Sequence, residues 1–198
     1  GEIEEKIGDG FLRVHRGCLV AVMAIHNVTD TINLSNGESL GYTARKKGEI
    51  MQTLRNTQMG MIREFQNHGV PMTNDEYHDY YRSFDQLPFA FTDIEMVFDE
   101  EKRAVDWIFR YGNPELARLE KLPLDRLIGN SFGSFFSNMD SKWLRSYERA
   151  VLYGEKLELI DYSPEIDANL KVTCFPTFPG HCGCILFNIS EIKFVSSR

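Results

Sequence analysis

The chain has 198 residues, a length that fits one large domain or two small ones. Hydrophobic residues make up 42% and charged residues 26% of the chain, which predicts a packed core and excludes wholesale disorder. No apolar run approaches the ~20 residues that span a bilayer, and the acidic start GEIEEKIGDG is not a secretory signal, so we expect a cytoplasmic protein without membrane contact.

Charge is distributed unevenly along the chain. Residues 1–57 carry seven Lys or Arg and seven Asp or Glu, residues 58–82 carry two against four, and residues 83–198 carry thirteen against eighteen. DNA-binding proteins draw most of their affinity from Lys and Arg side chains that neutralise phosphates. The acidic C-terminal part is therefore a poor candidate for nucleic-acid binding, and the locally basic N-terminal part is the better one.

The N-terminal part has the patterns of short strands. Polar and apolar side chains alternate over residues 11–15, as expected for a half-buried strand, and residues 18–25 are almost wholly apolar. Over residues 30–43 the alternation continues on both sides of Asn36-Gly37. Because these two residue types tolerate positive φ angles, the pattern predicts a β-hairpin closed by a type I′ turn.

Two stretches in this part carry a family resemblance, FLRVHRGCLVAV (residues 11–22) and INLSNGESLGYTARKK (residues 32–47). A strand, His-Arg, a hydrophobic turn, an Asn-Gly hairpin and a basic helix start follow in the order found in the second half of a LytTR domain, a DNA-binding module of bacterial response regulators. The resemblance covers about residues 11–56. The family has further strands upstream, where this chain has residues 1–10, so it implies a partial DNA-binding segment over residues 1–57.

This resemblance implies that four basic residues contact DNA: Arg16 after the first strand, and Arg45, Lys46 and Lys47 at the helix start. The arginine fork suits the role because it can bind guanine or clamp a phosphate. The alternative is a set of solvated side chains on a truncated scaffold. We expect DNA to be a partner of the intact parent protein, with weak, salt-sensitive binding by this chain alone.

From residue 44 onward the apolar period changes from two to about 3.6, which predicts an amphipathic helix that ends at residue 67 or 68. Thr73 and Glu76 then fit a capping box that opens a second helix. An aromatic stripe on that helix is formed by Tyr77, Tyr80, Tyr81 and Phe84. This stripe must be buried against a neighbouring domain or a second copy of the chain. We interpret residues 58–83 as a helical connector. The apolar surface of the two helices over residues 44–84 predicts a homodimer.

The C-terminal part has the pattern of an antiparallel sheet interrupted by helices. Asn113 and Pro114 fit the N-cap and the first position of a short helix. Asp140 fits the N-cap of a longer helix that ends at Gly154. The predicted strands lie at residues 89–98, 104–111, 157–162, 170–175 and 182–189.

Several short motifs occur in a characteristic order in this part of the chain. They are Asn113-Pro114, Leu127-Ile128-Gly129 ahead of Phe132, Phe135 and Phe136, Trp143, Tyr162-Ser163-Pro164-Glu165, and Phe187-Asn188-Ile189-Ser190-Glu191. Together they resemble a PAS domain, the small antiparallel-sheet sensor of bacterial signalling proteins. The resemblance covers about residues 84–193, leaves residues 194–198 as a tail, and implies a sheet with helices on one face.

A PAS-like fold implies a ligand pocket between the sheet and its helices. We expect Phe132, Phe136 and Trp143 to line it, with Cys174 contributed by the sheet, around a small and mostly apolar molecule. The alternative is an ordinary packed core, because aromatic side chains at these spacings also supply core area. Neither a flavin-type reactive cysteine nor a haem-ligand pattern is recognised, so no cofactor is predicted.

Cys174, His181, Cys182 and Cys184 are residue types found in zinc sites, but they lack the paired Cys-x-x-Cys spacing of such sites. In a strand, Cys182 and Cys184 point to the same face, which suits burial in a core. We therefore predict reduced, structural cysteines and no metal. The sequence has no nucleophile motif, P-loop or dinucleotide fingerprint, so no catalytic residue is predicted and the protein is not expected to be an enzyme.

The sequence as a whole predicts an α+β fold. A partial LytTR-like β-rich segment is followed by a helical connector and then by a PAS-like antiparallel sheet with helices on one face. The predicted function is signal-responsive regulation of bacterial transcription. The alternative is a PAS sensory and dimerisation module of a larger signalling enzyme, such as a cyclic-dinucleotide synthase or a histidine kinase, whose effector lies outside this chain.

Overall fold

The structure is a computed structural model, and it describes residues 10–68, 72–137 and 139–191. The chain divides into two compact units, residues 1–64 (unit 1) and residues 65–198 (unit 2). The division falls within the long helix α2 (Lys47–His68). Each unit has its own hydrophobic core. Within the described residues, no helix is long and apolar enough to cross a membrane.

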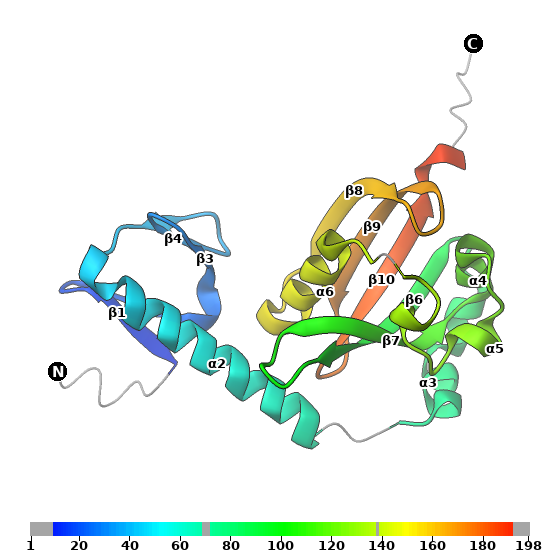
Figure 1. The fold of residues 1–198 in the computed structure, drawn as a ribbon, viewed down its shortest axis with the longest axis horizontal. Helices are drawn as coiled ribbons and strands as arrows, with labels where there is room; N and C mark the ends of the chain where they lie inside the picture. The colour runs from blue at the N-terminus through cyan, green and yellow to red at the C-terminus, as the bar shows by residue number, and fades with distance from the viewer. Residues whose placement is uncertain (1–9, 69–71, 138, 192–198) are drawn as a thin grey trace, which may run out of the picture. The chain divides into compact units, whose positions relative to one another are not determined.

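Unit 1 combines two small antiparallel sheets with the first part of α2 (Figure 1). One sheet pairs β1 with β2, and the other has the order β3-β4-β5. The described elements ahead of α2 are β1 (Phe11–His15), β2 (Cys18–Ala21), η1 (Val22–Ala24), β3 (Ile25–Val28), β4 (Ile32–Leu34), β5 (Ser39–Leu40) and η2 (Ala44–Lys46). Leu12 and Val14 alternate with more exposed residues along β1 and enter a core that also contains Ile50 of α2. The predicted change from strand to helix periodicity is confirmed.

The hairpin between β4 and β5 differs from the predicted one. Gly37 has a positive φ of 88°, but Asn36 does not adopt positive φ. The N–H of Gly37 donates to the carbonyl of Leu34 at 3.0 Å, and the Asn36 side chain accepts from the N–H of Glu38 at 3.0 Å. A type I′ turn needs positive φ at both central residues. The predicted type I′ turn is therefore wrong, and the longer loop places only its glycine in the left-handed region.

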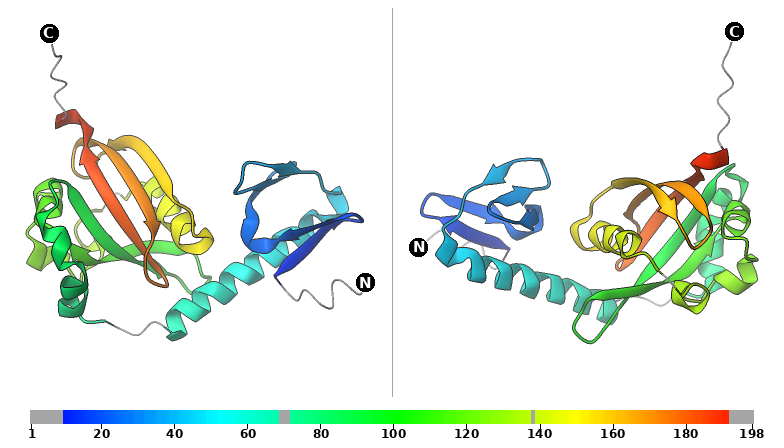
Figure 2. Two further views of the ribbon diagram at one scale, coloured as in Figure 1. Left: turned by 180° about the vertical axis from the view of Figure 1, so that it is seen from behind. Right: turned by 45° about the horizontal axis from the view of Figure 1, so that its top comes forward.

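Unit 2 is organised around one sheet of five antiparallel strands. Their order is β7-β6-β10-β9-β8, so the first and last strands of unit 2, β6 and β10, pair with each other. Figure 2 shows these strands running side by side. The strands are β6 (Ala90–Phe98), β7 (Ala104–Gly112), β8 (Leu157–Ser163), β9 (Ala168–Pro176) and β10 (His181–Asn188), followed by η5 (Ile189–Glu191).

One face of this sheet is covered by the segment between β7 and β8. Its elements are α4 (Pro114–Glu120), α5 (Leu124–Leu127), η4 (Phe132–Ser134) and α6 (Ser141–Tyr153). The Asp140 side chain accepts from the N–H of Lys142 at 3.0 Å, and Gly154 ends α6 with a positive φ of 66°. Trp143 and Tyr147 of α6 are buried against the sheet in the main core. The predicted start and end of α6 are thus confirmed.

The opposite face of the sheet is partly covered by α3 (Asn74–Tyr81) and η3 (Arg82–Gln86). The predicted capping box is present, because Thr73 and Glu76 exchange hydrogen bonds at the start of α3. Tyr77 and Tyr81 are buried on the sheet, whereas Tyr80 is 64% exposed. The aromatic stripe is therefore buried in part within unit 2. The predicted α+β class with an antiparallel sheet is confirmed, and helical elements contact both of its faces.

Asn113 holds several segments of unit 2 together from a fully buried position. Its side-chain oxygen accepts from the N–H groups of Phe91 at 3.0 Å and Leu116 at 3.1 Å. Its side-chain nitrogen donates to the carbonyls of Phe84 at 3.2 Å and Phe89 at 2.8 Å. The predicted N-cap is confirmed, and the same amide also binds β6 and the chain that leads into it.

We predict that Asn113→Ala lowers the free energy of unfolding by about 3 kcal/mol, because four backbone groups lose their side-chain partner and several of them are buried. Urea unfolding of both proteins measures the loss. Asn169→Ala is the matched control, since this exposed side chain bonds only to Ser190 in the described structure, and it should change stability by about 0.5 kcal/mol or less. Equal losses for the two variants would contradict this role of Asn113.

Candidate functional site

A cluster of basic residues in unit 1 comes from the β1–β2 turn and from the start of α2. This basic cluster consists of Arg13, Arg16, Arg45, Lys46 and Lys47. The Lys46 Nζ donates to the carbonyl of Arg13 at 3.1 Å, and the Arg13 guanidinium donates to the carbonyl of Arg16 at 2.9 Å. The fold therefore brings the turn and the helix start together, as a shared binding surface would need.

The members of the basic cluster differ in burial and in whether an acidic side chain pairs with them. Lys46 is half-buried and forms an ion pair with Glu49 at 3.3 Å, so it also ties the helix start to β1. Arg16, Arg45 and Lys47 are exposed, and within the described residues no acidic side chain pairs with them. Residues 10–64 carry seven Lys or Arg against four Asp or Glu. Three cationic side chains are thus available for an external anion.

The residues predicted to line a ligand pocket have different surroundings in unit 2. Phe132, Trp143 and Cys174 are buried in the main core. The Phe132 ring lies 4.5 Å from that of Phe136 and 4.4 Å from that of Trp107, measured between centroids. Phe136 is only partly buried and lines a cavity that opens nearby. Of the four predicted residues, Phe136 alone borders this cavity.

This cavity, which we call the α4 cavity, has a volume of about 440 Å³. It lies where the end of α4, the chain through α5 and η4, and the turn between β8 and β9 meet. Its lining residues are Glu120, Lys121, Leu122, Arg126, Ser134, Phe135, Phe136, Glu165, Ile166 and Asp167. A volume of this size lies within the range of small-molecule binding sites.

Glu120 is the last residue of α4 and the most deeply buried acid of the α4 cavity, with 8% of its surface exposed. Within the described part of the chain, no group donates a hydrogen bond to its carboxyl. Burial, and then the nearby charge of Glu165, raise the pKa of Glu120 to about 7. Its carboxyl can therefore gain or lose a proton near neutral pH.

The neighbours of Glu120 are held in place by their own hydrogen bonds. Glu165 accepts from the N–H of Asp140 at 2.9 Å and from the Ser163 hydroxyl at 2.7 Å. Lys121 ends α4 in the left-handed region with φ 56°, and its Nζ donates to the carbonyl of Ile166 at 3.2 Å. These contacts join the end of α4 to the β8–β9 turn, and they leave Glu120 as the unpartnered acid between them.

A second buried polar group lies on the opposite face of the sheet. Asp93 is fully buried in β6 and accepts from Tyr81 at 2.7 Å, Thr177 at 2.5 Å and the His181 Nδ1 at 2.7 Å. The other imidazole nitrogen of His181 lies 3.3 Å from the Tyr77 hydroxyl. Burial raises the pKa of Tyr77 to about 12, so this hydroxyl stays protonated. The cluster fastens α3 to the sheet.

The cysteines weighed as metal ligands lie in the main core. Cys174, Cys182 and Cys184 are buried, and the sulfurs of Cys182 and Cys184 are 3.8 Å apart. His181 points to the opposite face, toward Asp93 and α3. Burial raises the pKa of the Cys184 thiol, which disfavours a thiolate ligand. Within the described residues, no group of three or more His, Cys, Asp or Glu side chains could hold a metal ion.

Neither Asp93 nor Glu120 was singled out from the sequence. Asp93 lies between Thr92 and Ile94 in a mostly apolar strand, and its signal is that it shares a face with Phe91 two residues earlier. Glu120 stands at a helix end, where acids are usually solvated, and it meets Glu165 only through the fold. A polar residue at a position that the periodicity assigns to the core is the signal that could have identified Asp93.

Comparison with known proteins gives limited similarity. No protein-family model matches the chain, and no curated protein matches it. Among solved structures, the chain is similar to a domain of a sensory box sensor histidine kinase/response regulator from Geobacter sulfurreducens. The sequence identity is 15%, the match covers 55% of this chain and 90% of that one, and the TM-score is 0.37. The LytTR-like part of the chain stays a prediction.

We predict that Glu120→Gln stabilises the protein, with a gain that grows as the pH rises from about 4.5 to about 7. The carboxyl pKa is raised from 4.5 to about 7 on folding, so the unfolded chain releases this proton at lower pH than the folded protein. Below this window Glu120 costs the folded state nothing, and above it the cost is complete, at about 3 kcal/mol.

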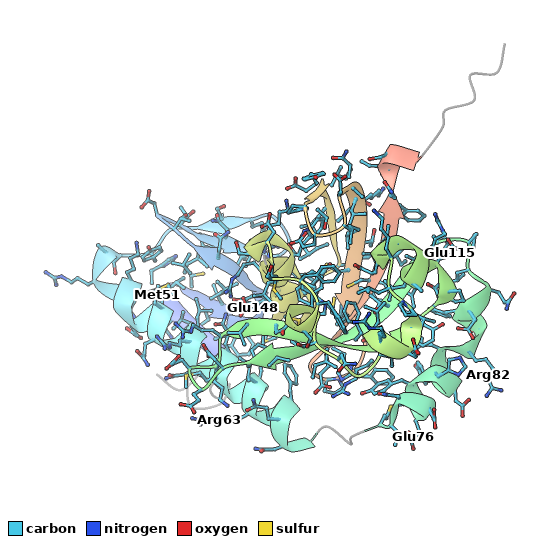
Figure 3. The ribbon with its side chains drawn as sticks, turned by 45° about the vertical axis from the view of Figure 1, so that its right-hand side comes forward. Met51, Arg63, Glu76, Arg82, Glu115 and Glu148 are labelled. Carbon is cyan, nitrogen blue, oxygen red and sulfur yellow. The ribbon has the colours of Figure 1, made fainter. Side chains whose placement is uncertain are left out.

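Urea unfolding at a series of pH values measures this gain. Glu115→Gln is the matched control, because it removes the same charge from the other end of α4, where Figure 3 labels Glu115. Glu115 pairs there with Arg118. Its effect on stability should vary little across the same pH window. A Glu120→Gln gain that is absent or independent of pH would contradict the raised pKa.

Proposed function

We propose that this chain is part of a signal-responsive regulator of bacterial transcription. Unit 2 acts as a PAS-type sensor, and unit 1 supplies a LytTR-type DNA-binding segment; neither part is an enzyme. The observation that carries the proposal is the contact between Lys46 and Arg13, which places the start of α2 beside the β1–β2 hairpin, with Arg16, Arg45 and Lys47 exposed on these segments. The order of strand, hairpin and basic helix start around them is the one that the LytTR resemblance requires.

The basic cluster is suited to a DNA backbone or a guanine edge. Arginine side chains bind phosphate or the guanine edge in a two-pronged geometry, and lysine adds a point charge. Three such contacts release few counterions, so binding is weak, and log affinity falls against log salt with a slope of only about −3. This agrees with a segment that holds only part of a DNA-binding domain.

The sensor role of unit 2 is supported by its sheet and by its α4 cavity. The five-strand order places the helices that follow β7 over one face, where they enclose apolar side chains beside the cavity. On the other face, the Asp93 cluster fastens α3 to the same strands. Occupancy of the cavity can therefore affect α3 through the sheet and through Asn113, which binds both α4 and the middle of η3.

The alternative function is a sensory and dimerisation module of a larger signalling enzyme. It is favoured by the acidic character of residues 83–198, which carry thirteen Lys or Arg against eighteen Asp or Glu. It is also favoured by the α4 cavity and the α3 anchor, because both lie within unit 2 and need nothing from the basic cluster. In both functions unit 2 senses, and DNA binding by unit 1 discriminates between them.

We predict weak binding of the full chain to a mixed-sequence DNA duplex, measured by fluorescence anisotropy over a series of salt concentrations. Arg16→Ala and Arg45→Ala should each weaken binding and reduce the slope of log affinity against log salt by about 1. Lys156→Ala is the control, because Lys156 is exposed in unit 2, and it should change neither quantity. Binding that is absent at low salt, or insensitive to both arginine variants, would favour the alternative function.

We also predict that the chain forms a homodimer, with a mass by light scattering of twice 22.9 kDa at micromolar concentration. Met51 on α2 is 48% exposed, and large exposed apolar side chains are typical of association surfaces (Figure 3). Met51→Gln should shift the protein toward monomer, whereas Gln52→Ala, at the adjacent exposed position, should not. A monomeric wild-type chain would contradict this prediction.

A further inference from the structure

The polar groups around the α4 cavity are satisfied to different degrees. Glu165 accepts two hydrogen bonds, and the Asp167 carboxylate accepts from the Tyr162 hydroxyl at 2.7 Å. The Lys121 Nζ donates to a backbone carbonyl at 3.2 Å. Only 8% of the surface of Glu120 is exposed, and within the described residues nothing donates to its carboxyl. The cavity thus contains one acid, Glu120, that is largely buried as a residue and has no hydrogen-bond donor in the described structure.

An unpartnered buried carboxyl is costly, and a second carboxylate nearby increases that cost. A group that carries positive charge and N–H donors would remove both penalties at Glu120. An anion would instead meet Glu120, Glu165 and Asp167 together. The two basic residues of the lining do not offset this, because Lys121 is already bonded to Ile166 and Arg126 is exposed at the rim.

The remaining walls of the α4 cavity suit an apolar body. Leu122, Ile166, Phe135 and Phe136 supply apolar and aromatic surface beside Glu120. The guanidinium carbon of Arg126 lies 5.8 Å from the Phe135 ring centroid, so an aromatic face at this site already contacts a cation. A divalent metal does not fit these residues, because no metal-binding group occurs within the described part of the chain.

We propose that the α4 cavity binds a small organic cation, with an amine or guanidinium group that pairs with the Glu120 carboxylate and an apolar body that contacts Phe135 and Phe136. This proposal rests on the proposed function of unit 2 as a sensor, and it names the class of its ligand. It differs from the sequence-based expectation of an apolar ligand beside Trp143 and Cys174, because those two residues do not line this cavity.

The test uses three probes of similar shape and different charge, namely benzylamine, benzyl alcohol and benzoate, with the full chain at neutral pH. Isothermal titration calorimetry measures each affinity. Benzylamine should bind about tenfold more tightly than benzyl alcohol, because a charge-assisted hydrogen bond replaces a neutral one. Benzoate should bind more weakly than either probe.

Two variants identify the residue responsible. Glu120→Gln should weaken benzylamine binding by about tenfold and leave benzyl alcohol binding nearly unchanged, because the amide keeps the shape of the side chain. Glu115→Gln on the same helix is the matched control and should leave all three affinities unchanged. Circular dichroism checks that Glu120→Gln folds, as expected for a variant that removes a buried charge.

Proton release gives a further readout that a purely structural role for Glu120 would not change. Slightly below neutral pH, benzylamine should displace the proton that Glu120 holds, so the measured heat should depend on the ionisation enthalpy of the buffer. Glu120→Gln should abolish this dependence. Benzylamine binding that is absent, or equally tight in Glu120→Gln, would overturn the proposal.

Other outcomes separate this proposal from the proposed function. If benzoate or benzyl alcohol binds more tightly than benzylamine, and Phe136→Ala weakens that binding, the cavity is a ligand site for another chemical class. The cationic ligand is then wrong and the sensor role stands. DNA binding by the arginine variants is measured in a separate experiment. If those variants bind DNA as well as the wild-type chain, that result does not bear on the α4 cavity.

Discussion

The side-chain amide of Asn113 joins three parts of unit 2 that are distant in the sequence. It caps the first turn of α4, accepts from the backbone of β6, and donates to carbonyls at η3 and just before β6. Because a buried amide of this kind has one acceptor and one donor group to satisfy, its partners must hold fixed positions relative to one another. The direction of α4, and hence the position of Glu120 at its far end, depends on this contact.

The two faces of the sheet use buried polar groups in different ways. On the α3 face, Asp93 accepts three hydrogen bonds, so its burial is compensated and the cluster stabilises the attachment of α3. On the α4 face, Glu120 is buried without a donor within the described residues. A satisfied group gives rigidity, whereas an unsatisfied group favours a ligand that can complete it. This contrast is why the α4 cavity, and not the Asp93 cluster, is the candidate binding site.

Much of the fold could be predicted from the sequence because its signals are local. The capping box at Thr73, the N-cap at Asn113 and the left-handed end at Gly154 each depend on residues within a few positions of one another. The Asn36-Gly37 pair correctly marked a turn but not its type, since the longer loop let Asn36 avoid positive φ. That choice depends on loop length and strand register, which the residue pair alone does not specify.

The candidate site was harder to predict because it is formed by tertiary contacts. Aromatic spacing identified Phe132, Phe136 and Trp143 but could not separate residues that fill a core from those that border a cavity. Glu120 and Glu165 are far apart in the sequence and approach each other where Lys121 joins the end of α4 to the β8–β9 turn. The basic cluster was easier, since its residues lie at a turn and a helix start that the sequence marks directly.

The central claim is that Glu120 is a buried carboxyl that binds a cationic ligand. An NMR titration of its labelled carboxyl carbon in the full chain tests this claim most directly. We predict that this carboxyl titrates with a pKa near 7, because it is buried beside Glu165. Addition of benzylamine should then clearly lower that pKa. A carboxyl that titrates near its ordinary value of 4.5, with or without benzylamine, would contradict the account.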